Sequence, residues 1–281
     1  MARFGSANRV MRNRTFSGAG LEINCVDYGG EGLAPLLFIH GGSAFGHWWD
    51  YVAPAFTGRF HTLAMDLRGH GESGWSQSGA YGLRDYAGDV TAMVAGWGLG
   101  APVLVGHSRG GLVAILHAAA HREAVRALAV IDSLPQTTEE MLAWSQSMKT
   151  WRPRKYATLE DACASFRLLP AETHATPEML RQIARFAYRQ DEDGTWIVRI
   201  DPRCRARDGC NVFEHLDAIA CPTLIIKAAL SPLLPRDVAQ QMARALRHGA
   251  MAEIENAYHH AMLDNPAALT RTLSGFLTPF Q

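Results

Sequence analysis

Short apolar runs alternate with longer helical patterns along most of this chain, and this alternation is the feature that most constrains its fold. Continuous apolar runs suit strands that are buried on both faces of a parallel sheet. They span residues 36–39, 62–65, 103–105, 127–131, 223–226 and 252–254. The helical patterns between or after them span residues 83–97, 110–121, 236–247 and 266–276. Each is long enough for a crossover connection, so the sequence predicts an α/β fold with helices on both faces of a mostly parallel sheet.

Two segments depart from this alternation. Residues 21–28 alternate apolar and polar side chains and end at two glycines, which is typical of a half-exposed strand at an antiparallel edge. After residue 131, roughly seventy to eighty residues of helix-like sequence come before the next apolar run. Helical patterns there span 139–148, 159–168 and 177–189. We therefore expect a core formed by residues 1–132 and 211–281, with a helical cap inserted at 133–210.

Length, composition and charge exclude several classes of protein. The chain has 281 residues, of which 48% are hydrophobic and 19% charged, so it can bury one large core and is unlike a disordered chain. Its formal net charge is zero and no dense basic stripe is present, so nucleic acid is not an expected partner. The arginine-rich start lacks a following apolar run, and no stretch approaches ~18 apolar residues. We expect a cytoplasmic protein without a membrane span.

Five scattered cysteines bear on metal and redox chemistry. They are Cys25, Cys163, Cys204, Cys210 and Cys221. They lack the paired spacing of a structural zinc site or of a redox dithiol. We interpret them as reduced thiols and predict no metal site.

The clearest chemical signal is the segment Gly106-His107-Ser108-Arg109-Gly110. It satisfies the pattern G-x-S-x-G between an apolar run and an apolar-faced helix. A turn this sharp needs glycine on both sides of the serine, because a Cβ at Gly106 or Gly110 would collide with neighbouring backbone. The turn would hold Ser108 at the carboxyl end of the sheet, where the following helix N-terminus favours negative charge. A chance match in a glycine-rich turn is the alternative, and the flanking strand and helix argue against it.

With this motif in place, the sequence resembles the α/β-hydrolase family over nearly its whole length. The resemblance implies an eight-stranded, mostly parallel sheet with an inserted helical cap. Residues 38–43 are similar to the family's strand and following HG loop, which supplies one amide of the oxyanion hole. The implied oxyanion donors are the backbone N–H groups of Gly42 and Arg109, and Ser43 beside them is an expected pocket residue. Residues 66–73 look like the family's D-x-R-G-x-G-x-S loop, which we expect to be structural.

The predicted general base is His259. Residues 256–266 resemble the family's loop that carries the catalytic histidine before the last helix, and His259 lies seven residues ahead of Pro266, the usual spacing in the family. The adjacent His260 is the competing candidate. In a plainer interpretation, one or both are exposed loop histidines.

The acid that would orient this histidine is harder to place. The family most often has it in the loop that here spans residues 227–232, but this loop contains no carboxylate and has Ser231 at the expected position. Some members carry the acid after the strand that follows the nucleophile helix, where this chain has Asp132. Without such a partner, nothing would fix which imidazole nitrogen carries the proton or how the ring is oriented. We therefore predict Asp132, for which a helix or turn cap is the alternative role.

Two groups in the expected cap have only weak functional arguments. Arg203, Arg205 and Arg207 form a local basic cluster flanked by two aspartates, so a solvated face is the simpler interpretation unless the substrate is a carboxylate. Trp144 is an expected pocket residue because its position on the cap favours facing the active site.

Together these residues predict a cofactor-free serine hydrolase that cleaves an ester or related acyl bond of a small molecule through an acyl-enzyme. The same residues are similar to those of family members that hydrolyse carbon–carbon or amide bonds, or act as lyases or perhydrolases. A ligand-binding receptor of this fold is a further alternative. Dehalogenase or epoxide-hydrolase chemistry is disfavoured, because those relatives use Asp where this chain has Ser108. The sequence leaves open a homo-oligomer.

Overall fold

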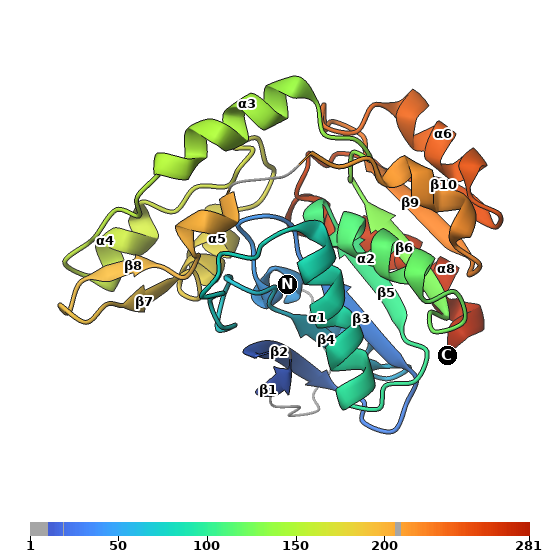
Figure 1. Ribbon diagram of the computed structural model, residues 1–281, viewed down its shortest axis with the longest axis horizontal. Coiled ribbons are helices and arrows are strands. Elements are labelled where there is room, and N and C mark those ends of the chain that lie inside the picture. The colour runs from blue at the N-terminus through green and yellow to red at the C-terminus, as the bar shows by residue number, and fades with distance from the viewer. Residues whose placement is uncertain (1–10, 19, 206–208) are drawn as a thin grey trace.

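The computed structural model describes residues 11–18, 20–205 and 209–281, and its main element is an eight-stranded sheet (Figure 1). The strands are β1 (Arg12–Gly18), β2 (Leu21–Gly29), β3 (Pro35–Ile39), β4 (His61–Met65), β5 (Val103–His107), β6 (Ala127–Ile131), β9 (Thr223–Ala228) and β10 (Gly249–Ile254). Their order in the sheet is β1-β2-β4-β3-β5-β6-β9-β10. From β4 to β10 all neighbours are parallel, whereas β2 pairs antiparallel with both β1 and β4. The predicted α/β fold is thereby confirmed.

Helices cover both faces of this sheet. The four long ones are α1 (Leu83–Gly96), α2 (Arg109–Ala120), α6 (Arg236–Ala245) and α8 (Pro266–Leu277). Helices α1, α2 and α6 contribute to one buried apolar cluster, while α8 contributes to the other, together with the short helices η1 (Gly46–Trp49) and η2 (Ala53–Phe56). In Figure 1, α1 and α2 lie in front of the strands and α8 lies behind them.

Strand β3 shows why the apolar runs are continuous. Leu36 and Phe38 point into one buried cluster, and Leu37 and Ile39 point into the other. Successive side chains of a strand face opposite sides, so a strand covered on both sides must be apolar at every position.

The segment between β6 and β9, which we call the inserted segment, lies to one side of the core in Figure 1. It contains α3 (Glu139–Ser147), η3 (Met148–Thr150), α4 (Leu159–Ala164), α5 (Pro177–Ala184), β7 (Tyr188–Gln190), β8 (Trp196–Val198), η4 (Pro202–Arg205) and, leading back to the core, η5 (Val212–Ala218). Two of its predicted helices were too long. The helix from residue 159 stops at Ala164. The helix from residue 177 stops at Ala184, because Tyr188–Gln190 pairs antiparallel with Trp196–Val198.

The parallel strands determine where functional groups gather. Strands β3, β5, β6 and β9 run in the same direction, so the residues after their carboxyl ends meet at one edge of the sheet. The loop between β10 and α8, which includes the short helix α7 (Ala261–Asp264), also starts from this edge. Within the described ranges, no helix has the length and apolar character needed to cross a bilayer.

Candidate active site

The sharp turn between β5 and α2 carries Ser108 in a strained backbone conformation, with φ 52° and ψ −120°. Its amide donates to the carbonyl of Ile131, 2.9 Å away at the end of β6. An added Cβ would lie 2.4 Å from the carbonyl oxygen of Gly110 if placed on Gly106, and 2.3 Å from that of Ile39 if placed on Gly110. The structure therefore confirms that both positions require glycine.

The structure brings His259 and Asp132 into direct contact. Nδ1 of His259 donates to Oδ2 of Asp132 over 2.7 Å, and both side chains are buried. Asp132 directly follows β6, with φ 45°, and its own amide donates to the carbonyl of Ile226. For the competing His260, the contact is a different one: its Nε2 lies 3.0 Å from the carbonyl oxygen of Pro170.

Further hydrogen bonds hold the carboxylate of Asp132. The hydroxyl of Ser231 donates to Oδ2 over 2.5 Å, and the amide of Ala228 donates to Oδ1 over 3.2 Å. Burial raises the pKa of Asp132, and these two hydrogen bonds act against that rise because they favour the ionised form. Ser231 stands where the family most often has its acid, so the sequence indicated the position, but only the structure reveals its contact with Asp132.

His107, the residue before Ser108, links the loop that carries His259 to the sharp turn between β5 and α2, which we call the elbow. Its Nε2 donates to the backbone carbonyl of His259 over 2.8 Å, and the two ring centroids are 4.5 Å apart. Burial lowers the pKa of His107 well below its usual value, so this ring is neutral. His259 is thereby held beside the strand end that presents Ser108, a contact that the sequence pattern did not reveal.

The HG loop after β3 packs directly against the elbow. A Cβ added to Gly41 would lie 3.1 Å from the Cβ of Ser108. The amide of Ser43 already donates to Nε2 of His70 over 3.3 Å, which leaves Gly42 as the candidate oxyanion donor of this loop. The second candidate is the amide of Arg109, the first residue of α2, because the first N–H groups of a helix have no acceptor within the helix.

Residues 66–73, which we predicted to be structural, hydrogen-bond to the HG loop and to the residues that follow it. His70 is buried, and burial lowers its pKa well below the usual value, so a neutral ring accepts from Ser43. Asp66 accepts from the amides of Gly46 and Glu72 over 2.6 and 2.9 Å. These bonds account for the buried polar residues that follow β4.

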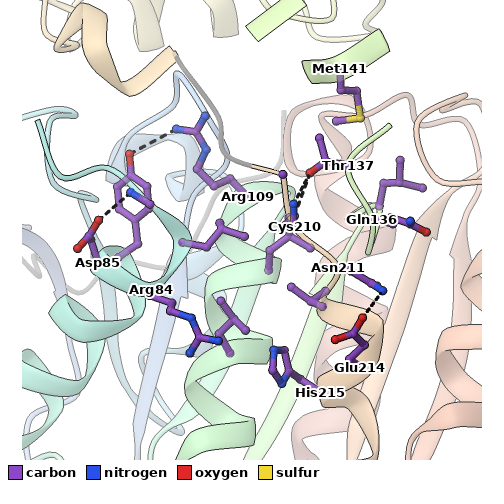
Figure 2. Close-up of a pocket in the computed structure, with 18 of the residues that line it drawn as sticks. Arg84, Asp85, Arg109, Gln136, Thr137, Met141, Cys210, Asn211, Glu214 and His215 are labelled. Atoms are coloured by element: carbon purple, nitrogen blue, oxygen red, sulfur yellow. Dashed lines mark hydrogen bonds between the residues drawn. The ribbon is translucent and has the colours of Figure 1, made fainter. Parts of the chain in front are cut away.

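Two cavities lie near the elbow. The larger, of about 510 Å³, lies between the first turns of α1 and α2 and residues 134–141 and 209–215 (Figure 2). The smaller, of about 300 Å³, is bordered by Gly42 and Ser43. Trp144, which we expected in the pocket, is 46% exposed and lines neither cavity. Trp151 from the same inserted segment lines the smaller one instead.

Two groups in the described part of the chain bring possible metal ligands within 4.8 Å of one another: His107 with His259 and His260, and Asp27 with Glu31 and His61. In the first group, hydrogen bonds to Asp132 and to a backbone carbonyl already use one nitrogen each of His259 and His107. In the second group, Nε2 of His61 hydrogen-bonds to Asp27 over 3.1 Å. In both groups, some of the candidate ligand atoms thus already take part in hydrogen bonds within the chain.

The fold and this edge of the sheet define a class of hydrolytic enzymes, and the sequence comparison agrees. The model of the alpha/beta hydrolase family matches residues 36–272, so the chain belongs to this family.

Individual relatives are distant but nearly full-length. The chain is 26% identical over 260 residues to Esterase Rv0045c from Mycobacterium tuberculosis, covering 91% of this chain and 86% of that protein. It is 24% identical over 275 residues to the 3-hydroxybutyrate-oligomer hydrolase of Cupriavidus necator, covering 90% and 92%. Its structure is similar to that of E-2-(acetamidomethylene)succinate hydrolase, with a TM-score of 0.84 and 21% identity over 96% of this chain and all of that one. The chain is thus a hydrolase of this fold.

Proposed function

We propose that this protein hydrolyses an ester or related acyl bond of a small molecule, with Ser108 as nucleophile, His259 as general base and Asp132 as the orienting acid. The observation that carries the proposal is the 2.7 Å contact between Nδ1 of His259 and Asp132, next to the nucleophile elbow. The names of two relatives, an esterase and a 3-hydroxybutyrate-oligomer hydrolase, also favour this reaction class.

In the proposed reaction, Nε2 of His259 takes the hydroxyl proton of Ser108 while the serine oxygen attacks the acyl carbon. The negative oxygen that forms there accepts hydrogen bonds from the amides of Gly42 and Arg109, and one such donor contributes about 3 kcal/mol to the transition state. His259 then gives its proton to the leaving alcohol. A water molecule, deprotonated by the same imidazole, releases the acid and restores the free serine. No cofactor enters these steps.

Burial of the acid–base pair suits this chemistry. The imidazolium that forms during attack needs a fixed negative partner, and the hydrogen bonds from Ser231 and Ala228 keep Asp132 oriented towards it. Because the pair is shielded from water, the interaction is stronger than it would be at the surface.

A fluorophosphonate probe tests the nucleophile directly. We expect one label per chain, located on Ser108 by peptide mass spectrometry, and no label on Ser108→Ala. Turnover of short-chain 4-nitrophenyl esters should fall to background in that variant, because the acyl-enzyme cannot form. A protein that neither reacts with the probe nor turns over any ester would instead be explained by a ligand-binding role.

A further inference from the structure

The smaller cavity, which borders the oxyanion loop, is lined by positive charge. Its wall contains four arginines, and none of the residues that the structure places along it is acidic. They are Arg152, Arg154, Arg167 and Arg205. A chain with equal numbers of basic and acidic residues does not give this asymmetry by composition alone. We call this space the arginine-lined cavity.

Arg205 is the arginine least accessible to water in this group. Its Nε is buried and has no hydrogen-bond acceptor, and its guanidinium lies over the ring of Trp151, 3.8 Å from the ring centroid. Burial and the nearby Arg109 both lower the pKa of Arg205, so its surroundings disfavour the positive charge. A buried cation is costly unless an anion and hydrogen-bond acceptors compensate it.

Arg109 brings a second guanidinium to the same region. Its side chain is 7% exposed, and its Nη1 donates to the carbonyl of Cys204 over 3.0 Å, next to Arg205 in the chain. The same Nη1 lies 3.5 Å from the hydroxyl of Tyr86 on α1, and Figure 2 shows Arg109 extending from the start of α2. The guanidinium carbon lies 3.3 Å from where a Cβ of Gly42 would be, so the charge lies against the oxyanion loop.

The other three arginines of the cavity are more exposed than Arg205, but they too lack an acidic partner in the described part of the chain. Arg152 and Arg167 donate to backbone carbonyls, and Arg154 lies over the ring of Tyr156. For all four arginines of the cavity and for Arg109, no carboxylate among the described residues lies within 4.0 Å. Six other arginines in the described ranges do pair with acids, although some, such as Arg59 and Arg126, do not.

Three of these paired arginines show the contrast. Arg68 binds Asp89, Arg203 binds Asp201, and Arg236 binds Glu253. Arg203 and Arg205 therefore differ although they come from the same cluster in the sequence. Arg203 belongs to a local ion pair, whereas Arg205 faces the cavity. Arg207 lies outside the described residues.

We propose that the substrate carries a carboxylate, which the arginine-lined cavity binds while the reacting acyl group lies at the oxyanion loop. This inference rests on the proposed function. A guanidinium presents two parallel N–H donors that match the two oxygens of a carboxylate. The volume of about 300 Å³ is at the lower end of small-molecule sites, so the ligand part held there is a short acidic chain or ring.

Matched ester pairs test the charge preference. The first pair places the charge on the acyl side: 4-nitrophenyl hydrogen adipate and 4-nitrophenyl heptanoate. The second places it on the alcohol side: 4-acetoxybenzoate and its methyl ester, for which the rate of acetyl-ester hydrolysis is measured by the release of the phenol. We expect kcat/KM to be at least about tenfold higher for the charged member of one pair, since a charge-assisted hydrogen bond in a shielded site contributes that much.

Variants assign the preference to the cavity. Arg205→Gln should reduce kcat/KM for the charged ester at least about tenfold more than for its neutral partner, and Arg205→Lys should recover part of the loss. Arg244→Gln is the matched control, because Arg244 is exposed on α6, far along the chain from the inserted segment. It should leave both rates unchanged. An equal loss on both esters in Arg205→Gln would show a merely structural role and overturn the inference.

Binding measurements keep the two proposals separate. Adipate should bind the wild type and Arg244→Gln in calorimetry, and bind Arg205→Gln at least about tenfold more weakly. Ester turnover without any charge preference would overturn the carboxylate assignment while the hydrolase proposal stands. If no ester is turned over, adipate binding still decides the inference. Equal binding of inorganic phosphate would contradict selectivity for a carboxylate.

Discussion

At the scale of single residues, two contributions to kcat can be measured separately: the charge of Asp132 and the hydrogen bond that Ser231 donates to it. Asp132→Asn removes the charge that orients His259, so kcat should fall on the order of 10³–10⁴-fold with the fold intact. Ser231→Ala removes one donor but leaves the contact with His259, so we expect a loss of about tenfold. Steady-state kinetics on a neutral ester, with circular dichroism to check folding, measure both. Near-normal turnover by the asparagine variant would refute the assigned role.

Motif spacing predicted which residues meet at the sheet edge, but it did not predict their supporting contacts. Ser108, Asp132 and His259 could be proposed because each follows a recognisable strand or precedes a recognisable helix. The hydrogen bond from Ser231 to Asp132 joins residues 99 positions apart, so no local sequence pattern predicts it. Arg205 gave the same local signal as Arg203, although only one of them pairs with Asp201. Side-chain direction in irregular segments is decided by tertiary packing, which periodicity does not describe.

At the scale of elements, the elbow joins β5 to α2 with no room for a side chain, and Gly110→Ala tests this. The new Cβ would lie 2.3 Å from the carbonyl oxygen of Ile39, so either β3 or α2 must shift. We expect a loss of at least about 2–3 kcal/mol of unfolding free energy in urea titrations. Gly88→Ala in the exposed middle of α1 is the control, because its Cβ meets nothing within 4 Å and alanine favours a helix. Equal stability of both variants would contradict this account of the turn.

The same scale shows which elements a sequence can reveal. Strands β3 to β6 and β9 were predicted within a few residues, because burial on both faces requires continuous apolar runs. Strand β1 was missed, since Arg12–Gly18 is largely polar and forms a strand only by pairing with β2 at the sheet edge. The β7–β8 hairpin was missed for a related reason: three-residue strands have too few positions to show a period. The predicted domain boundaries, the localisation and the partners stay predictions.

At the scale of the whole molecule, buried neutral histidines link stability to pH. Burial lowers the pKa of His40 to about 3 and of His117 to about 4, whereas an unfolded chain titrates histidine near ~6.5. Below that pH the unfolded state binds protons that the folded state does not, so the unfolding free energy falls as pH falls. Buried Asp66 and Asp89 act in the opposite direction, because burial raises their pKa. The contribution of one histidine to the pH dependence of the unfolding free energy must therefore be measured by comparing the wild type with variants of that histidine.

His117 is suited to this comparison because it lies in the last turn of α2, at the other end of the helix from Ser108. Its neighbours are Thr91 and His121. Between pH 7.5 and 5.0 the wild type should lose up to about 2 kcal/mol more unfolding free energy than His117→Gln, since the unfolded variant has no imidazole to protonate there. His117→Leu should show the same reduced pH dependence although it cannot hydrogen-bond to Thr91, which separates proton binding from the loss of that bond. Urea titrations at the two pH values measure the difference. If all three proteins lost equal stability, His117 would have to bind its proton equally well in the folded and unfolded states.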